Sequence, residues 1–193
     1  MENKLFGVYL AGKIRKNDWR QIVVPNHRSA LDNSDIGKLF FAEYEDTAIR
    51  GLYTTGPFFI SCDHGCYHGK NSHGVAAGRE GCGGKGVSAE VVPMVCMEQI
   101  RKSDFVFAYI DAESCFGTLC EIGYAVGIGK PVAVMFADEE LRTKMWFTAE
   151  TANIEFNKEG DLLRSNIRDA KVNGSSIMIA ELLSGKYDDM EDD

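Results

Sequence analysis

The sequence has no excess of positive charge and no long hydrophobic run. Its 193 residues carry a formal net charge of −8, whereas binding along nucleic-acid backbones or on anionic membranes requires clusters of Lys and Arg. The N-terminal stretch MENKLFGVYLAG holds only a short apolar run before the charged KIRKNDWR, so we expect neither a secretory signal nor a membrane-spanning helix. This composition favours a cytoplasmic protein that acts on a small molecule, without nucleic-acid or membrane partners.

The signals of a disulfide-stabilised protein are also missing. The six cysteines would pair in an exported protein, but without an export signal the reducing cytoplasm favours free thiols or metal ligands. We therefore expect no structural disulfide.

Two common nucleotide-binding motifs are absent. No G-x-G-x-x-G follows the first apolar run, which argues against a dinucleotide-binding Rossmann unit. The segment GREGCGGKG superficially resembles a phosphate loop, yet Arg79 stands where that loop needs its first glycine, and Gly86 stands where it needs Ser or Thr. We expect no cofactor.

The composition predicts one domain. With 45% hydrophobic and 26% charged residues, a chain of this length buries one substantial core. No internal repeat or low-complexity block divides it. We assign residues 1–186 to this domain and the acidic residues 187–193 to a frayed tail.

Short apolar runs bounded by polar residues predict four buried strands. They lie at 5–11, at 104–110, at 131–136 and within 51–61. Helical spacing of apolar residues predicts helices from Pro93 to Lys102 and from Thr118 to Ile128, and two shorter helices after the polar turn at 157–161. The alternation of strand and helix implies right-handed crossovers. The expected fold class is therefore α/β, a flavodoxin/Rossmann-like parallel sheet with flanking helices.

Glu121 is the residue whose position first suggests chemistry. Ligands of parallel α/β sheets bind at the carboxyl ends of the strands, where the following helices begin, and Glu121 falls near such a helix start. The free amide groups and dipole of a helix start favour the ionised carboxylate that a nucleophile requires. A glutamate chosen for the helix dipole alone would show the same spacing. The expected helix has one face with Gly117, Thr118, Glu121 and Ala125, and an opposite face with Leu119, Ile122 and Val126.

The stretch YIDAESCFGTLCEIGYAVGIGKPVAVMF closely resembles the signature of the nucleoside 2-deoxyribosyltransferase superfamily. In that superfamily a GT-x-x-E-x-GYA helix follows a strand and precedes GKPV and another strand. The opening VYLAG and the strand KSDFVFAYID also match, in the expected order. The resemblance therefore covers roughly half of the chain, and the combination of motifs is more specific than any one of them.

The resemblance implies a two-step displacement. A glutamate attacks the anomeric carbon, the base leaves, and a second base or water resolves the glycosyl-enzyme. Glu121 matches this nucleophile, and Tyr9 matches the first-strand tyrosine that hydrogen-bonds it; the alternative for Tyr9 is a plain core position. Contacts to the substrate are expected from the neighbouring motif residues Gly12, Gly117 and Thr118.

The resemblance also implies a homo-oligomer in which neighbouring subunits complete each active site. The stretch KMWFTAE at 144–150 is an aromatic patch that suits such a contact. The alternative is that Trp146 and Phe147 belong to the core.

Two positions depart from the superfamily's pattern. Where it often has an aspartate six residues before the nucleophile and another on the preceding helix, this chain has Cys115 and, approximately, Cys96. A thiol is a poor substitute for a carboxylate that protonates a base or binds sugar hydroxyls, so we expect base recognition to differ. The candidate replacements are Asp111 and Glu113 beside the motif, or Asp63, His64 and His68 in the long loop. Asp111 fits a cap of the turn after its strand equally well.

The long loop at 62–86 contains eight glycines and three histidines, and loops of this length are usually functional or disordered. It holds six residues of metal-ligand types, but the pattern C-x-H-x-C-x-H lacks the paired C-x2-C arms of a closed zinc site. We predict a loop that contacts the ligand and holds no metal, with bound zinc and plain surface as the alternatives. The six residues are Cys62, His64, Cys66, His68, His73 and Cys82.

The segment DWR at 18–20 follows the first predicted strand. This position would bring Asp18 or Arg20 to the mouth of a pocket. Exposure on the surface is the simpler expectation for both side chains.

Three functions fit these observations. The leading hypothesis is cleavage of the N-glycosidic bond of a nucleoside or nucleotide, either by transfer to a second base or by hydrolysis. Cleavage of the nicotinamide ribosyl bond of NAD is an alternative, since related flavodoxin-like folds perform it with a similarly placed glutamate. A non-catalytic nucleotide sensor is the third, although a sensor has no need of a poised nucleophile.

Overall fold

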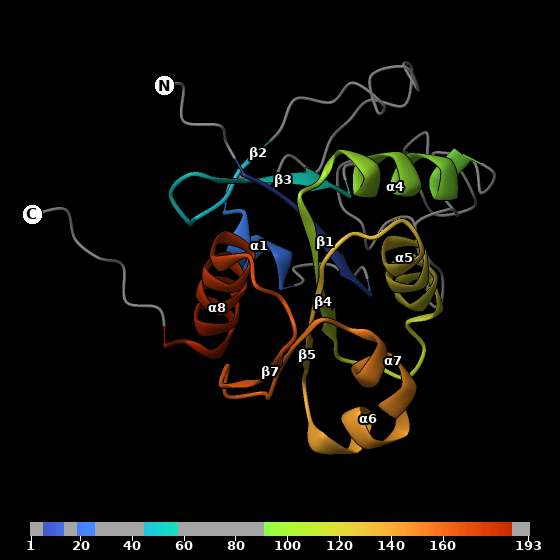
Figure 1. Ribbon diagram of the computed structural model, residues 1–193, viewed down its shortest axis with the longest axis vertical. Coiled ribbons are helices and arrows are strands. Elements are labelled where there is room, and N and C mark those ends of the chain that lie inside the picture. Colours follow the sequence, from blue (N-terminus) through green and yellow to red (C-terminus); the bar gives the residue numbers. More distant parts are fainter. Residues whose placement is uncertain (1–5, 14–18, 26–44, 58–90, 187–193) are drawn as a thin grey trace, which may run out of the picture.

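The computed structural model describes residues 6–13, 19–25, 45–57 and 91–186. These residues form one sheet with helices on both of its faces (Figure 1). The strands are β1 (Phe6–Gly12), β2 (Glu45–Asp46), β3 (Leu52–Gly56), β4 (Phe105–Ile110), β5 (Val132–Phe136), β6 (Ile154–Phe156) and β7 (Leu162–Ser165). The helices are α1 (Arg20–Val23), α4 (Val91–Lys102), α5 (Phe116–Gly127), α6 (Glu139–Lys144), α7 (Trp146–Thr151) and α8 (Ala170–Ser184). The predicted α/β fold class is confirmed.

Parallel strands form the centre of the sheet, in the spatial order β3-β1-β4-β5-β6. The strands β2 and β7 pair antiparallel at its two edges. Numbered along the chain, the central strands have the order 2-1-3-4-5 of flavodoxin-like folds. The order reverses between β1 and β4, and ligands of such folds bind outside the carboxyl ends of the strands at this switch point.

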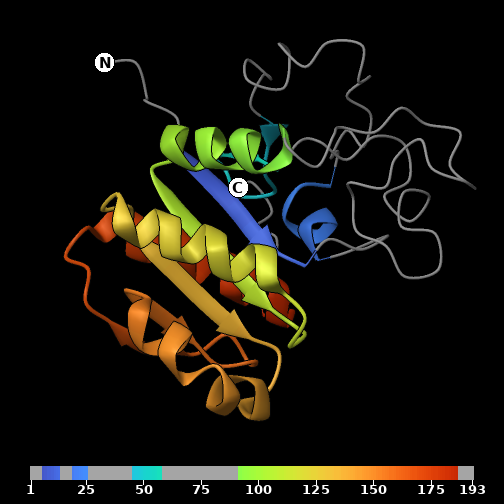
Figure 2. The ribbon, with the colours of Figure 1, turned by 90° about the vertical axis from the view of Figure 1, so that its right-hand side faces the viewer.

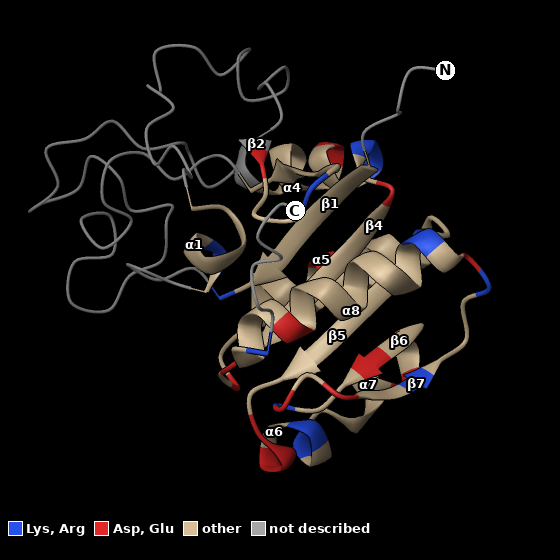
Figure 3. Cartoon of the chain, turned by 90° about the vertical axis from the view of Figure 1, so that its left-hand side faces the viewer, with Lys and Arg blue, Asp and Glu red and all other residues tan. Residues whose placement is uncertain are grey.

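Side chains of the central strands alternate between two cores. Figure 2 shows α4 and α5 in front of one face of the sheet, and Figure 3 shows α8 across the opposite face. Both faces are covered, so the strands are apolar along almost their whole length. Full burial of one such large side chain contributes about 1.5–3 kcal/mol. The first core includes Tyr9, Val106, Val134 and Ile122, and the second includes Leu10, Phe107, Met135 and Ile179.

Local capping interactions fix where α6 and α8 begin and where α8 ends. The Asp138 carboxylate accepts a hydrogen bond from the Leu141 amide at 2.7 Å and so starts α6. Asp169 accepts from the amides of Lys171 and Val172 at the start of α8. The same helix ends at Gly185, whose φ of 75° is a left-handed conformation that favours glycine. Each aspartate cap contributes about 1 kcal/mol.

The four predicted strands are present as β1, β3, β4 and β5. The bounds of β1, β4 and β5 differ from the predicted ones by no more than one residue, and β3 lies within the predicted range 51–61. The helix predicted from Pro93 begins two residues earlier, at Val91, and the helix predicted from Thr118 begins at Phe116. The structure also contains the two-residue strand β2, which the sequence pattern did not indicate.

The prediction for the chain after residue 161 was wrong. Instead of two short helices, the structure has strand β7 followed by the single helix α8. The strand β6 was also missed because it is three residues long and has the charged Glu155 at its centre. Glu155 is buried but is paired with Arg142 and Arg164, which is how its charge is tolerated within the sheet.

The described helices are too short, or too polar, to cross a membrane. The predicted boundary between the domain and the tail at 187–193 lies outside the described residues.

Candidate functional site

The described residues bring Tyr9 and Glu121 together at the switch point of the sheet. The Tyr9 hydroxyl donates a hydrogen bond of 2.6 Å to Oε1 of Glu121, although the two residues are 112 positions apart in sequence. Tyr9 extends from the middle of β1, and Glu121 from α5, which follows β4. The predicted contact between these residues is therefore present.

The orientation of α5 explains why Glu121 reaches the sheet. Thr118, Ile122 and Ala125 are the buried residues of the helix, and Glu121 lies partly exposed beside them. The predicted faces of the helix were partly wrong, because Ile122 lies on the same side as Thr118 and Ala125. Val126, which we expected on the same face as Ile122, is 36% exposed.

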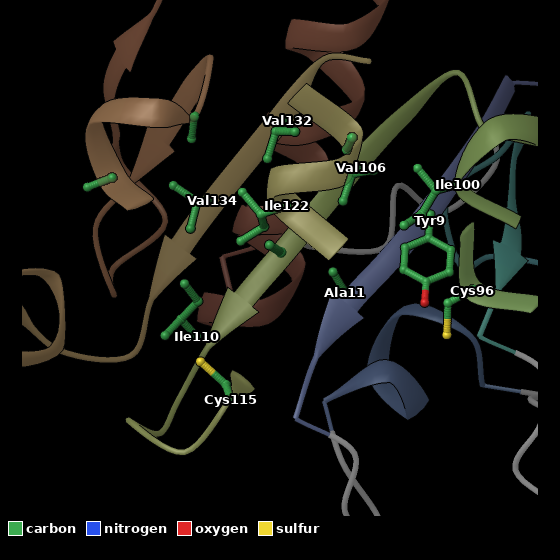
Figure 4. Close-up of a cluster of buried hydrophobic side chains, with 14 of the residues drawn as sticks. Tyr9, Ala11, Cys96, Ile100, Val106, Ile110, Cys115, Ile122, Val132 and Val134 are labelled. Carbon is green, nitrogen blue, oxygen red and sulfur yellow. The ribbon is translucent and has the colours of Figure 1, made fainter. Parts of the chain in front are cut away.

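A third group, the thiol of Cys96, completes this cluster from α4. The side chain is 4% exposed, and Figure 4 shows the Tyr9 hydroxyl directed toward it, whereas Cys115 lies apart beside Ile110. Burial raises the pKa of the Cys96 thiol, and the negative charge of Glu121 raises it further. The thiol is thus a neutral neighbour of the carboxylate rather than a second acid.

Burial raises the pKa of both Tyr9 and Glu121. The rise supports Tyr9 as a hydrogen-bond donor but opposes the ionised form of Glu121 that a nucleophile requires. Burial raises the pKa of Tyr9 well above its ordinary value, with Cys96 and Glu121 adding to the effect, so the phenol keeps its proton and acts as a donor. Burial also raises the pKa of Glu121 above its ordinary value of 4.5. The Tyr9 hydrogen bond, the charge of Arg20 and the Cys96 side chain partly oppose that rise.

The expectation that the helix start would favour ionised Glu121 was therefore wrong in its net effect. Because α5 begins at Phe116, Glu121 is in the second turn, and the dipole effect falls off within the first turn. Desolvation is the largest influence on this carboxyl group.

Arg20 was also predicted wrongly, since the side chain is 2% exposed rather than on the surface. Its Nε donates to the Leu10 carbonyl at 2.9 Å, and a terminal nitrogen donates to the Gly12 carbonyl at 2.7 Å. The sequence did contain a signal for this burial: Arg20 precedes Val23 and Val24 at helical spacing, and both valines are buried. Asp18 lies outside the described residues.

The predicted substrate contacts at Gly12, Gly117 and Thr118 occupy three different environments. A side chain on Gly12 would place its Cβ 2.8 Å from Nε1 of Trp19, so close packing by itself requires glycine there. Gly117 is exposed, with open space where a Cβ would lie. Thr118 is 3% exposed and packs inward from α5. Of these three, Gly117 leaves the most space for a ligand.

Polar residues surround the loop between β4 and α5. Asp111 directly follows β4 and is partly buried, and its negative charge adds to the burial that raises the pKa of Cys115. Lys13, just beyond β1, donates to the Ser114 hydroxyl at 2.7 Å. Glu113 is exposed and forms an ion pair with Lys144. The structure therefore brings Asp111 and Lys13 to the carboxyl ends of β4 and β1. Glu113 instead forms its ion pair with Lys144 and does not contact Glu121.

The remaining predicted residues, Asp63, His64 and His68, lie outside the described residues, as do the other members of the Cys/His loop. Within the ranges that the structure describes, no cluster of three or more His, Cys, Asp or Glu side chains is arranged to hold a metal ion.

Comparisons of this chain with protein-family models, with curated proteins and with solved structures give no match.

Proposed function

We propose that the protein cleaves the N-glycosidic bond of a nucleoside or nucleotide and that Glu121 is the nucleophile. In the first step, a carboxylate oxygen of Glu121 bonds to the anomeric carbon. The bond from that carbon to the base breaks, and its electron pair leaves with the base nitrogen. In the second step, the nitrogen of another base, or a water molecule, attacks the same carbon and releases the carboxylate. The proton that the attacking group loses balances the proton that the departing base gains.

One observation carries the proposal, the 2.6 Å hydrogen bond from buried Tyr9 to Glu121 at the switch point of the sheet. A hydroxyl that donates to one carboxylate oxygen fixes the rotamer of the side chain and leaves the second oxygen for attack. This pairing joins the two residues that the resemblance to the nucleoside 2-deoxyribosyltransferase superfamily assigns to catalysis. The location also agrees with where flavodoxin-like sheets bind their ligands.

A second candidate, cleavage of the nicotinamide ribosyl bond of NAD, is favoured by the neutral thiol beside Glu121. The base of an uncharged nucleoside would leave as an anion, so its nitrogen needs a proton from a general acid. The raised pKa of the Cys96 thiol makes that group a weak acid. Nicotinamide leaves from a positively charged ring and needs no proton. A leaving group of this kind therefore suits the described groups around Glu121.

Incubation with a panel of substrates tests the proposal and separates these candidates. The panel contains nucleosides, 2′-deoxynucleosides, their monophosphates and NAD, each with and without a second free base, and chromatography identifies the products. Transfer yields a new nucleoside or nucleotide only when the second base is present. Hydrolysis yields the base with the free sugar or sugar phosphate, and hydrolysis of NAD yields nicotinamide and ADP-ribose. If no compound of the panel is consumed, the proposed activity is wrong.

The raised pKa of Glu121 predicts an unusual effect of Glu121→Gln on stability. The folded protein holds the proton of this carboxyl more tightly than the unfolded chain does, so ionisation of Glu121 destabilises the fold as the pH rises through the two pKa values. We expect the Gln variant to have a higher melting temperature than wild type at pH 7. The gain should disappear below the ordinary glutamate pKa, where wild-type Glu121 is protonated in both states.

Thermal unfolding of both proteins between pH 4 and pH 8 checks this prediction. A Gln variant that is less stable than wild type by the same amount at every pH would show that Glu121 carries no buried-charge penalty.

We further propose that α7 contributes to a contact between subunits. Trp146 and Phe147 are 63% and 69% exposed, which rules out the alternative that they belong to the core. Their rings lie 5.7 Å apart edge to face, and Phe116 at the start of the neighbouring α5 is 72% exposed. Large exposed aromatic side chains that lie together are typical of interfaces.

The double variant Trp146→Ala/Phe147→Ala is expected to be monomeric where the wild type is oligomeric. Light scattering after size-exclusion chromatography measures the mass of each. The matched control is Leu162→Ala/Leu163→Ala, which removes another exposed apolar pair, 44% and 50% exposed on the edge strand β7. A monomeric wild type, or an equal loss of mass in the control, would contradict the assignment.

A further inference from the structure

The guanidinium group of Arg20 is buried against the end of the strand that carries Tyr9. Arg20 begins the short helix α1, and its side chain is 2% exposed. Two of its nitrogens donate to the carbonyls of Leu10 and Gly12, at 2.9 and 2.7 Å. The guanidinium carbon also lies 4.8 Å from the centre of the Trp19 ring. These contacts hold the group in place by hydrogen bonds and by a cation–π interaction.

The two carbonyls belong to the part of β1 that determines where Tyr9 lies. Leu10 directly follows Tyr9, and Gly12 is the last residue of the strand. Trp19 packs against Gly12, so the Trp19–Arg20 pair contacts the carboxyl end of β1 through both side chains. A change at Arg20 would therefore shift the strand from which the Tyr9 hydroxyl reaches Glu121.

The positive charge of Arg20 also acts on the carboxylate of the site. Among the described residues, the side chains that influence the pKa of Glu121 come from three elements. They are Tyr9 from β1, Cys96 from α4 and Arg20 from α1. Arg20 is the cation of this set, and its charge lowers the pKa of both Glu121 and Cys96. A buried arginine is costly unless an anion or hydrogen bonds compensate its charge, and here the carbonyls and the nearby carboxylate provide both.

We propose that Arg20 is a positioning residue of the site, which anchors the carboxyl end of β1 and brings a buried positive charge to the cluster of Tyr9, Cys96 and Glu121. This inference rests on the proposed function of Glu121 as a nucleophile. Arg20 has no direct role in bond cleavage. It acts through Tyr9 and Glu121.

The variants Arg20→Gln and Arg20→Lys separate charge from anchoring. Removing the cation in Arg20→Gln raises the pKa of Glu121 further, so the pH below which kcat/KM declines should move upward. Arg20→Lys keeps the charge but not the two-nitrogen contact, so that pH should stay near the wild-type value while kcat falls on the order of 10- to 100-fold through misplacement. The matched control Arg101→Gln removes an arginine that is exposed on α4 and should change neither quantity.

A second measurement keeps the test independent of turnover. In protein labelled with ¹³C at the glutamate carboxyl groups, the Glu121 signal is assigned from its absence in Glu121→Gln, and NMR then follows its titration without ligand. The inference predicts a higher titration midpoint in Arg20→Gln than in wild type and Arg20→Lys. If wild type cleaves no compound of the panel, the proposed function fails, yet this titration still decides the role of Arg20.

An unchanged Glu121 titration in Arg20→Gln, together with a lower melting temperature, would overturn the inference and make Arg20 a structural anchor alone. If Arg20→Gln does not fold, Arg20→Lys decides the matter. A folded Lys variant with wild-type kcat and an unchanged acid limb would overturn the positioning role.

Discussion

Glu121→Gln is expected to lower kcat at least about 10³-fold, an increase of about 4 kcal/mol in the activation barrier. The amide is a far weaker nucleophile than the carboxylate, so the covalent intermediate does not form. The Gln carbonyl still accepts the hydrogen bond from Tyr9. The variant also lacks the Glu121 carboxyl group, whose pKa is raised by burial, so no carboxylate charge is desolvated at this position. The fold should therefore persist, and the loss should appear in kcat rather than in KM.

The matched control for this variant is Glu159→Gln, which changes the same group at an exposed position between β6 and β7. The control should keep wild-type kinetics with each substrate that the panel identifies. If Glu121→Gln retains activity within about tenfold of wild type, a barrier change of only about 1.4 kcal/mol, the proposed mechanism is wrong.

Tyr9→Phe is expected to lower kcat by roughly 10- to 150-fold. The substitution removes one hydrogen bond to a charged group, which contributes on the order of 1.5–3 kcal/mol. Because that bond also lowers the pKa of Glu121, the acid limb of the pH–rate profile should move to higher pH as well. KM should change much less than kcat, and the free energy of unfolding should fall by no more than this one hydrogen bond contributes, because the ring stays buried.

Steady-state kinetics across pH test this expectation, with Tyr124→Phe as the control. Tyr124 lies on the same helix as Glu121, but its hydroxyl accepts from Nε of the exposed Arg101. A Tyr9→Phe variant with wild-type kcat, or one whose only defect is lower stability, would identify Tyr9 as a core residue without a role at the site.

The central strands could be predicted from the sequence because their physical signal is local. Both faces of the sheet are covered, so β1, β4 and β5 are apolar runs whose lengths and flanking residues suffice to identify them. The short strand β6 gives no such signal, since its central Glu155 is compensated only by Arg142 and Arg164, which lie on other elements. Tertiary pairing rather than local pattern determines that strand.

The candidate site was predicted in part. The Tyr9–Glu121 contact was anticipated from the motifs, but the electrostatics around it were not. The dipole of a helix start can be inferred from position, whereas the desolvation that dominates the pKa of Glu121 depends on packing by β1 and α4. Burial of Arg20 likewise results from carbonyl groups that only the folded strand presents.

The most direct test of the account is detection of the glycosyl-enzyme on Glu121. Wild-type protein is mixed with the best substrate of the panel in the absence of a second base and quenched in acid during turnover. Its intact mass is then measured, and the modified peptide is located by proteolysis and mass spectrometry. The account predicts a mass increase equal to the glycosyl part of that substrate, which is the substrate without its base, carried by the peptide that contains Glu121 and absent from Glu121→Gln. Substrate cleavage by a protein that shows no such adduct on Glu121, or a Glu121→Gln variant that turns over at the wild-type rate, would contradict it.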